Sequence, residues 1–446
     1  MSTVVALIDG EHYPPVVRSA LAALASEFDI VTAAFVGGTE KVDAGQDDVY
    51  GVPVVRGETA ERALVAAIER YRPHAVVDLS DEPVLTADDR FRLASIALAH
   101  GVEYRGADFV FSPPRAKLDL RTPALAIIGT GKRVGKTAVS AHVARWLKAR
   151  GVDVVVVAMG RGGPVAPELI RGDEVALTTA DLLALARQGK HAASDNYEDA
   201  MMSRVTTVGC RRCGGGLAGE TFFSNVAEGA RLADTLGKDL VILEGSGAAI
   251  PPVAADATLL VIGAGQGLRY VEGYFGPFRL ARADGVVIAG AEEPVATPEE
   301  VRGLVAAIER IRPGVPVVRT VFRPKPLEPI DGARVVFAST APPALLEHLV
   351  RHLEAEHGCT VVAASPHLSN RARLREDLAA AAGTADVFLT ELKAAAIDVV
   401  AALGEELGIR TVLADNVPQP VEGDDLDGLI EAAHALALAR GGKAGA

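Results

Sequence analysis

Residues 127–137 read Ile127-Ile128-Gly129-Thr130-Gly131-Lys132-Arg133-Val134-Gly135-Lys136-Thr137. The apolar run 123–128 predicts a short buried strand, and the apolar periodicity of 138–149 predicts a helix directly after the loop. A strand, a glycine-rich loop and a helix together bind nucleotide phosphates, because backbone amides and the helix N-terminus attract the oxygens. We therefore predict a phosphate-binding loop in a P-loop NTPase core with a mostly parallel sheet.

The glycine spacing of this loop departs from the usual motif. A Gly-x4-Gly-Lys-Ser/Thr pattern would place glycine at Thr130, whereas Gly129 and Gly135 have five residues between them. We predict that Lys136 reaches the β- and γ-phosphates of ATP and that the Thr137 hydroxyl holds Mg²⁺. A plain glycine-rich turn is the alternative, and it leaves the Gly-Lys-Thr run at the helix start unexplained. The predicted nucleotide-binding residues are Gly129, Thr130, Gly131, Lys132, Arg133, Val134, Gly135, Lys136 and Thr137.

An acidic residue follows a second apolar strand. Residues 240–243 are apolar and end at Glu244, before the turn Gly245-Ser246-Gly247. In P-loop proteins a neighbouring strand carries such an acid toward Mg²⁺. We therefore predict that Glu244 holds the metal with Thr137, directly or through water, and a solvated strand-end glutamate is the alternative.

Cationic residues stand at two further predicted strand ends and in one glycine-rich loop. Arg161 follows the apolar strand 154–158, Arg211 and Arg212 precede three glycines, and Lys393 closes the segment 390–393. Arginine binds phosphate through two parallel hydrogen bonds. We predict that these four residues bind an anionic substrate, with ordinary surface loops as the alternative.

Cys210 and Cys213 have the C-x2-C spacing of half a zinc site. The sequence contains three cysteines, so a four-cysteine site would need a second copy of the chain. We favour an anion-binding loop over a metal or redox role for this segment. The small number of cysteines implies no disulfide framework.

The chain of 446 residues is long enough for about two to four domains. Alternating strand and helix patterns predict an N-terminal Rossmann-like α/β domain over 1–115, the P-loop domain over 120–325, and a C-terminal α/β region over 330–440. The segment 322–329, with prolines at 324, 326 and 329, predicts a linker before the last region.

The charge and the apolar content of the sequence limit the classes of binding partner. The formal net charge of −13 argues against non-specific binding to nucleic acids or anionic membranes. No apolar run reaches the ~18–20 residues of a membrane span, and the N-terminus begins with an apparent strand rather than a basic signal peptide. We expect a soluble cytoplasmic protein, and a homodimer is the default assembly.

The phosphate loop and the Glu244-Gly245-Ser246-Gly247 turn are similar to those of dethiobiotin synthetase. The whole chain resembles the cyclic 2,3-diphosphoglycerate synthetase family more closely. That resemblance extends over the expanded loop, Arg161-Gly162-Gly163-Pro164, the Cys-Arg-Arg-Cys-Gly-Gly-Gly segment 210–216, and the segment 391–396. It implies that ATP, with Mg²⁺, drives closure of an intramolecular phosphoanhydride between the two phosphates of 2,3-diphosphoglycerate.

For that chemistry we assign catalytic roles to Lys132, Arg133 and Lys136, with Lys132 and Arg133 stabilising the charge that moves off the γ-phosphoryl group. Two other functions fit the motifs. One is another ATP-dependent ligase or kinase of the dethiobiotin synthetase type. The other is a nucleotide-switched ATPase that binds a protein partner.

Overall fold

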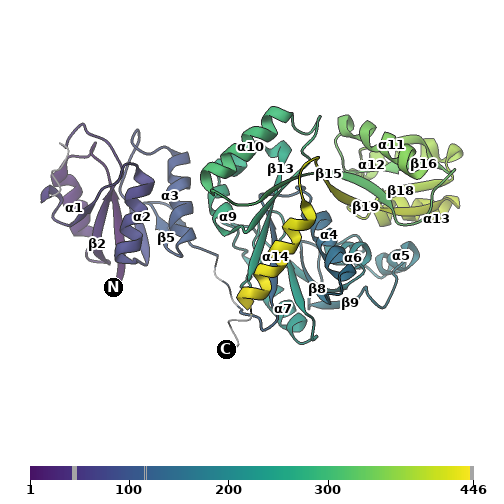
Figure 1. The fold of residues 1–446 in the computed structure, drawn as a ribbon, viewed down its shortest axis with the longest axis horizontal. Coiled ribbons are helices and arrows are strands. Elements are labelled where there is room, and N and C mark those ends of the chain that lie inside the picture. Colours follow the sequence, from purple (N-terminus) through teal and green to yellow (C-terminus); the bar gives the residue numbers. More distant parts are fainter. Residues whose placement is uncertain (43–47, 115, 117, 442–446) are drawn as a thin grey trace.

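The computed structural model describes residues 1–42, 48–114, 116 and 118–441. Figure 1 shows the N-terminal domain at one end of the molecule, the P-loop domain in the centre and the C-terminal region at the other end. Arg115, the last residue of the predicted N-terminal domain, and the tail 442–446 lie outside the described residues. None of the helices in the described ranges is long and apolar enough to cross a membrane.

The elements of the N-terminal domain are β1 (Ser2–Ile8), α1 (Pro14–Leu24), β2 (Phe28–Phe35), β3 (Val54–Val55), α2 (Ala60–Tyr71), β4 (Ala75–Asp78), α3 (Ala87–Ala99), β5 (Glu103–Arg105) and β6 (Val110–Phe111). The strand order is β3-β2-β1-β4-β5-β6. β6 is antiparallel to β5, and the other pairs are parallel. This order, in which the chain reverses direction across the sheet beside β1, is Rossmann-like, as the alternating pattern predicts.

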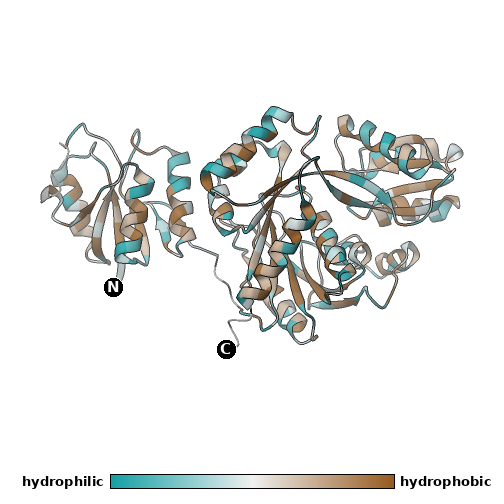
Figure 2. Ribbon diagram, viewed as in Figure 1, coloured by the Kyte–Doolittle hydropathy of each residue, from teal (hydrophilic) through white to brown (hydrophobic). Residues whose placement is uncertain are grey.

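The elements of the P-loop domain are β7 (Ala124–Gly129), α4 (Lys136–Ala149), β8 (Val154–Gly160), β9 (Glu168–Arg171), α5 (Thr179–Arg187), α6 (Asp195–Ser203), β10 (Thr206–Cys213), β11 (Phe223–Ser224), α7 (Val226–Asp234), β12 (Leu240–Glu244), β13 (Ala257–Gly263), α8 (Arg269–Glu272), α9 (Gly276–Arg282), β14 (Gly285–Ala289), α10 (Pro298–Ile311) and β15 (Val317–Pro326). Its main strands run in the order β10-β8-β12-β7-β13-β14-β15, and these neighbours are parallel. Every residue of β7, β8, β12 and β13 is buried, and Figure 2 shows how apolar this sheet is. Burial on both faces explains why these strands are continuous apolar runs.

The C-terminal region continues the same sheet. Its elements are β16 (Arg334–Ala338), α11 (Pro343–His357), β17 (Thr360–Ser365), α12 (Arg371–Ala381), β18 (Val387–Glu391), a π-helical turn (Ala396–Ala401), α13 (Ala402–Leu407), β19 (Arg410–Pro420) and α14 (Leu426–Gly441). β19 pairs antiparallel with β15, and β18, β16 and β17 follow. The last helix, α14, returns to the P-loop domain (Figure 1) and packs Leu429, Ile430 and Ala433 into the core with β7 and β13.

The predicted proline-rich linker 322–329 is wrong, because residues through Pro326 form the end of β15. Leu327 N donates to Leu413 O, so alternation along the strand turns the nitrogens of Pro324 and Pro326 away from β19. The pairing of β15 with β14 ends at Thr320, so within the described residues those two nitrogens face no strand. Proline is tolerated where the missing N–H would have no partner.

Aromatic side chains hold the N-terminal domain against the P-loop domain. The Phe275 ring, in the turn before α9, lies edge-on to Phe91 of α3 at 5.4 Å and to Phe111 of β6 at 4.9 Å between centroids. Phe278 of α9 packs against Phe275 in turn. Such edge-to-face contacts add to the burial of the rings, so α9 is the element on which the N-terminal domain rests.

Candidate active site

The phosphate loop folds back over its own lysine. The Lys136 ammonium donates to Gly131 O at 2.8 Å. A Cβ on Gly129 would lie 2.7 Å from Lys136 Cδ, so only glycine leaves room for this side chain. Arg133 and Gly135 both adopt positive φ, at 62° and 89°. The residue that expands the loop is thus accommodated by left-handed backbone at these two positions.

Lys136 is buried beside carboxylates. Burial lowers the pKa of Lys136 to about 8, while the carboxylates of Glu244 and Asp195 oppose this shift. A phosphate that accepted the hydrogen bond of the ammonium in place of Gly131 O would raise this pKa again, because a nearby negative charge favours the protonated form. The loop is held at a second point, because Thr130 Oγ1 donates to Gln266 Oε1 at 2.5 Å.

Glu244 ends β12 beside the phosphate-loop strand, where it is aligned with Ile127 of β7. Burial raises the pKa of Glu244, and the Thr137 hydroxyl counteracts the rise by hydrogen bonding to the carboxylate. Thr137 and Glu244, the two residues that we predict to hold Mg²⁺, thus interact in the fold. Asp199 of α6, which the motifs do not reveal, lies beside Glu244, and burial together with the Glu244 charge raises its pKa.

Part of the Asp199 and Glu244 pair has no compensating donor among the described residues. Both carboxylate oxygens of Asp199 and Oε2 of Glu244 are buried without a hydrogen-bond partner in the described part of the chain. Two buried carboxyls side by side need a proton or a cation between them. Oxygen ligands of this kind fit Mg²⁺. The described residues hold no cluster of three or more His, Cys, Asp or Glu side chains that could bind a metal alone, so phosphate and water oxygens would complete the shell.

Asp195, the first residue of α6, lies among the predicted cations. Burial raises the pKa of Asp195 against the opposing charges of Lys136 and Lys393. The Arg161 charge also acts against this rise, and burial together with the Arg161 charge lowers the pKa of Lys132. Cations from two domains thus act electrostatically on one carboxylate.

The two arginines of β10 point in different directions. Arg211 Nε donates to Gly163 O at 3.0 Å, which ties β10 to the loop after β8. Arg212 donates to Ser246 O at 2.8 Å and to Ser246 Oγ at 3.2 Å, in the turn after Glu244. Burial and the Arg161 charge lower the pKa of Arg212. The Arg212 guanidinium is therefore within electrostatic reach of Arg161. Arg211 instead stabilises the loop after β8.

Lys393 reaches the site from the C-terminal region. Its ammonium lies 3.4 Å from Glu198 Oε1 on α6. Burial raises the pKa of Glu198 to about 8, although Lys393 acts against the rise. Glu391, at the end of β18, accepts hydrogen bonds from Ser339 and Thr340, so the strand end that presents Lys393 is fixed by its neighbours.

The cysteine pair forms no disulfide. Cys210 is buried and Cys213 is exposed, and both thiols are free. A Cβ on Gly229 would lie 2.1 Å from Cys210 Sγ, so the buried thiol fills space against α7. This arrangement suits a packing role for Cys210.

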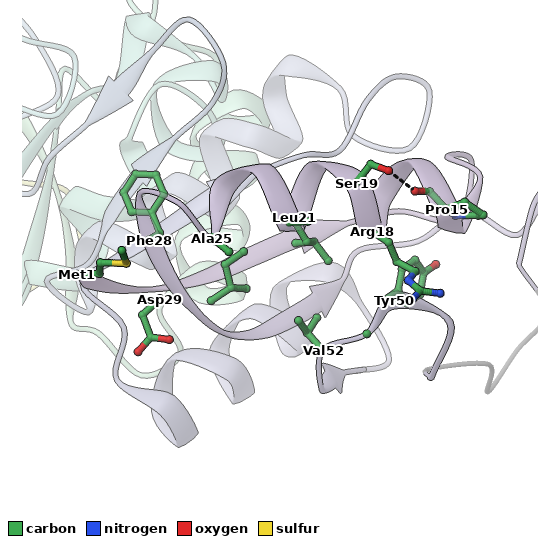
Figure 3. A pocket seen from close by; sticks show the side chains of 13 residues that line it. Met1, Pro15, Arg18, Ser19, Leu21, Ala25, Phe28, Asp29, Tyr50 and Val52 are labelled. Atoms are coloured by element: carbon green, nitrogen blue, oxygen red, sulfur yellow. Dashed lines mark hydrogen bonds between the residues drawn. The ribbon is translucent and has the colours of Figure 1, made fainter.

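A cavity of about 980 Å³ lies elsewhere, along α1 of the N-terminal domain. Figure 3 shows Arg18, Leu21, Phe28, Asp29 and Tyr50 around it. It contains none of the predicted site residues. It is therefore separate from the phosphate loop.

Sequence reasoning missed the acidic residues of α6 and Gln266. Asp195, Glu198 and Asp199 recur at helical spacings of three and four, which places them on one side of α6. That spacing beside predicted phosphate-binding cations is the signal that could have found them. Gln266, in a short 3-10 turn after β13, carries no comparable signal.

Comparison with known proteins decides the family. Three models of cyclic 2,3-diphosphoglycerate synthetase match the chain: the N-terminal domain over residues 3–112, the P-loop domain over 124–321 and the C-terminal domain over 326–417. The chain belongs to the cyclic 2,3-diphosphoglycerate synthetase family.

Relatives named cyclic 2,3-diphosphoglycerate synthetase match nearly the full length. The relative from Rubrobacter xylanophilus is 51% identical and covers 98% of this chain and 99% of its own. The relative from Methanothermobacter thermautotrophicus is 47% identical over 96% of this chain and 95% of its own. Among solved structures, LpxK from Aquifex aeolicus in complex with ATP aligns at a TM-score of 0.40 and 13% identity, covering 72% of this chain and 90% of that one. That likeness is too weak to bear on function.

Proposed function

We propose that this chain is an ATP-dependent synthetase that forms cyclic 2,3-diphosphoglycerate from 2,3-diphosphoglycerate, releasing ADP and phosphate. The observation that carries the proposal is the meeting of a phosphate-loop lysine, buried carboxylates and cations from two domains around Asp195. The names of the full-length relatives support the choice of substrate.

The reaction joins two phosphates that do not condense unaided, because both are anionic and a phosphate oxygen is a poor leaving group. In the first step an oxygen of one substrate phosphate attacks the γ-phosphorus of ATP, and ADP leaves. In the second step an oxygen of the other substrate phosphate attacks the phosphorus of the first substrate phosphate, and inorganic phosphate leaves. The protein contributes positioning and charge neutralisation to both steps.

The residues of the phosphate loop serve the first step. Lys136 holds the β- and γ-phosphates, while Lys132 and Arg133 stabilise charge on the transferring group. Thr137 and Glu244 are the side chains that would hold Mg²⁺, which neutralises charge on ATP when it is bound. Asp199 beside Glu244 would orient the water shell of the ion.

The substrate is a polyanion, since each phosphate carries about 1.5–2 negative charges at neutral pH. The charges of Arg161, Arg212 and Lys393 all act on Asp195, which supports the proposal that these residues hold the substrate, with Arg211 supporting the loop of Arg161 through Gly163. We also propose that the protein acts in the cytoplasm as a homodimer. The free thiols fit a reducing compartment, and twofold dimers are the commonest assembly. Light scattering on the purified chain tests the dimer.

The decisive experiment measures ATP hydrolysis with and without 2,3-diphosphoglycerate, followed by phosphorus NMR of the product. We expect turnover to depend on 2,3-diphosphoglycerate and the product to show phosphoanhydride resonances. The Lys136→Ala variant should retain its fold and lose turnover. Equal ATP hydrolysis without the substrate, or a product without a phosphoanhydride, would overturn the proposal.

A further inference from the structure

Arg279 of α9 is a buried arginine outside the phosphate site. It is 3% exposed, and its hydrogen bonds go to main-chain carbonyls. The guanidinium donates to Ala248 O at 2.7 Å, to Leu217 O at 3.2 Å and to Phe275 O at 3.2 Å. Burying a charge is costly unless it is well paired, so the position of this side chain calls for a reason.

The acceptors show what Arg279 joins. Ala248 belongs to the turn after β12, two residues beyond Ser246. Leu217 belongs to the glycine-rich loop after β10. A single terminal nitrogen of Arg279 bonds both carbonyls, so it ties together two loops that are far apart in sequence. The main chain adds one link between them, from Ile250 N to Gly219 O at 2.9 Å.

Both joined loops adjoin Arg212. Arg212 is the next-to-last residue of β10, the strand that leads into the Leu217 loop, and its guanidinium donates to Ser246 in the other loop. A Cβ on Gly247 would lie 3.2 Å from that guanidinium, so the turn is closely fitted to it. Any shift of the turn would therefore move Ser246, whose carbonyl and hydroxyl oxygens accept hydrogen bonds from Arg212.

Arg279 is itself held in place by the aromatic residues around it. It follows Phe278, and the Phe275 carbonyl that it binds belongs to the aromatic contact with the N-terminal domain. Figure 1 shows α9 between that domain and the central sheet. Tyr274 and Phe275 adopt positive φ, at 47° and 65°, a conformation that costs energy for such residues and persists where surrounding contacts impose it.

We infer that Arg279 is a positioning residue for substrate binding: it fixes the turn that accepts the hydrogen bonds of Arg212. Hydrogen bonds from a charged donor are stronger than neutral ones, and two carbonyls on one nitrogen set the distance between the loops. Through α9, the N-terminal domain thereby supports the turn that contacts Arg212. This inference goes beyond the proposed function. Only its test by KM for 2,3-diphosphoglycerate rests on that function.

The first test uses steady-state kinetics of full-length Arg279→Met, Arg279→Lys and Arg282→Met. Arg282 is an exposed arginine on the same helix and serves as the matched control. Losing charged hydrogen bonds should raise KM for 2,3-diphosphoglycerate by at least about tenfold in Arg279→Met, with KM for ATP near the wild-type value. Arg279→Lys should recover part of the loss, because an ammonium can keep one of the carbonyls. Arg282→Met should match wild type.

The second test needs no substrate. Amide hydrogen exchange is measured over residues 214–219 and 245–250 in the same variants. Arg279→Met should speed exchange in both segments, and Arg282→Met in neither. Unchanged exchange in Arg279→Met would overturn the inference, as would equal rises in both KM values. If the wild-type chain forms no cyclic product, the proposed function fails while the exchange data still decide the role of Arg279.

Discussion

Lys393 Nζ lies 3.4 Å from Glu198 Oε1, and this ion pair joins the end of β18 to α6 beside the phosphate loop. The Lys393 side chain is 31% exposed and that of Glu198 is 10% exposed. The ammonium can therefore reach a ligand from its solvent side while its carboxylate partner stays in place. The ion pair thus links the C-terminal region to α6 of the P-loop domain.

Replacing Lys393 with methionine should weaken substrate binding and leave ATP binding intact. The variant loses one cation opposite the substrate phosphates, so we expect KM for 2,3-diphosphoglycerate to rise about tenfold or more. Lys190→Met, which breaks an exposed pair with Glu168, is the control and should match wild type. Equal KM values in wild type and Lys393→Met would remove Lys393 from the substrate site.

Replacing Glu244 with glutamine should separate stability from activity. The pKa of Glu244 is raised in the fold, so its ionised form at neutral pH opposes folding. We expect a higher melting temperature in EDTA and an activity loss of roughly 10²-fold or more, with a higher Mg²⁺ requirement. The exposed Glu347 of α11 provides Glu347→Gln as the control. A lower melting temperature in EDTA would contradict the strained carboxyl pair.

Replacing Gly135 with alanine should damage the phosphate loop through two effects. Alanine at φ 89° costs about 1–2 kcal/mol, and its Cβ would lie 2.2 Å from Phe322 Cζ. Gly151→Ala separates the effects, because Gly151 has φ 84° and a Cβ added there would have no described atom within 4 Å. Urea unfolding should show the larger loss for Gly135→Ala, and ATP affinity should fall in that variant alone. Equal losses would show that the Phe322 contact is unimportant.

His142 of α4 should make the protein less stable in mild acid. Burial lowers the pKa of His142 from 6.5 to about 4. Between these values the unfolded chain binds the proton and the folded chain does not, so the free energy of unfolding falls as the pH drops from 6.5 toward 4. His142→Gln should flatten this part of the profile when urea unfolding is measured at pH 5 and pH 7.5. The same slope in variant and wild type would be evidence against a buried neutral imidazole.

The buried parallel strands could be predicted because each is a local apolar run. The phosphate loop and Glu244 could be located because glycine, lysine and an acid at strand ends are also local signals. The linker prediction around Pro324 is wrong, because a proline-rich run can also be a strand whose prolines face no hydrogen-bonding partner. Asp199 was missed because an acidic residue in a helix is ordinary until Glu244 lies beside it.

Local sequence patterns are enough to predict the α/β class, the phosphate loop with Lys136 and Thr137, and the acid at position 244. These features depend on backbone conformation and side-chain chemistry within a few residues. Three features follow from the tertiary fold alone: Lys393 pairs with Glu198 of α6, α14 returns to the P-loop core, and Arg279 joins two loops. These contacts form because one sheet continues through β15 and β19 and buries its faces against helices from distant parts of the chain, and no local pattern encodes such pairings.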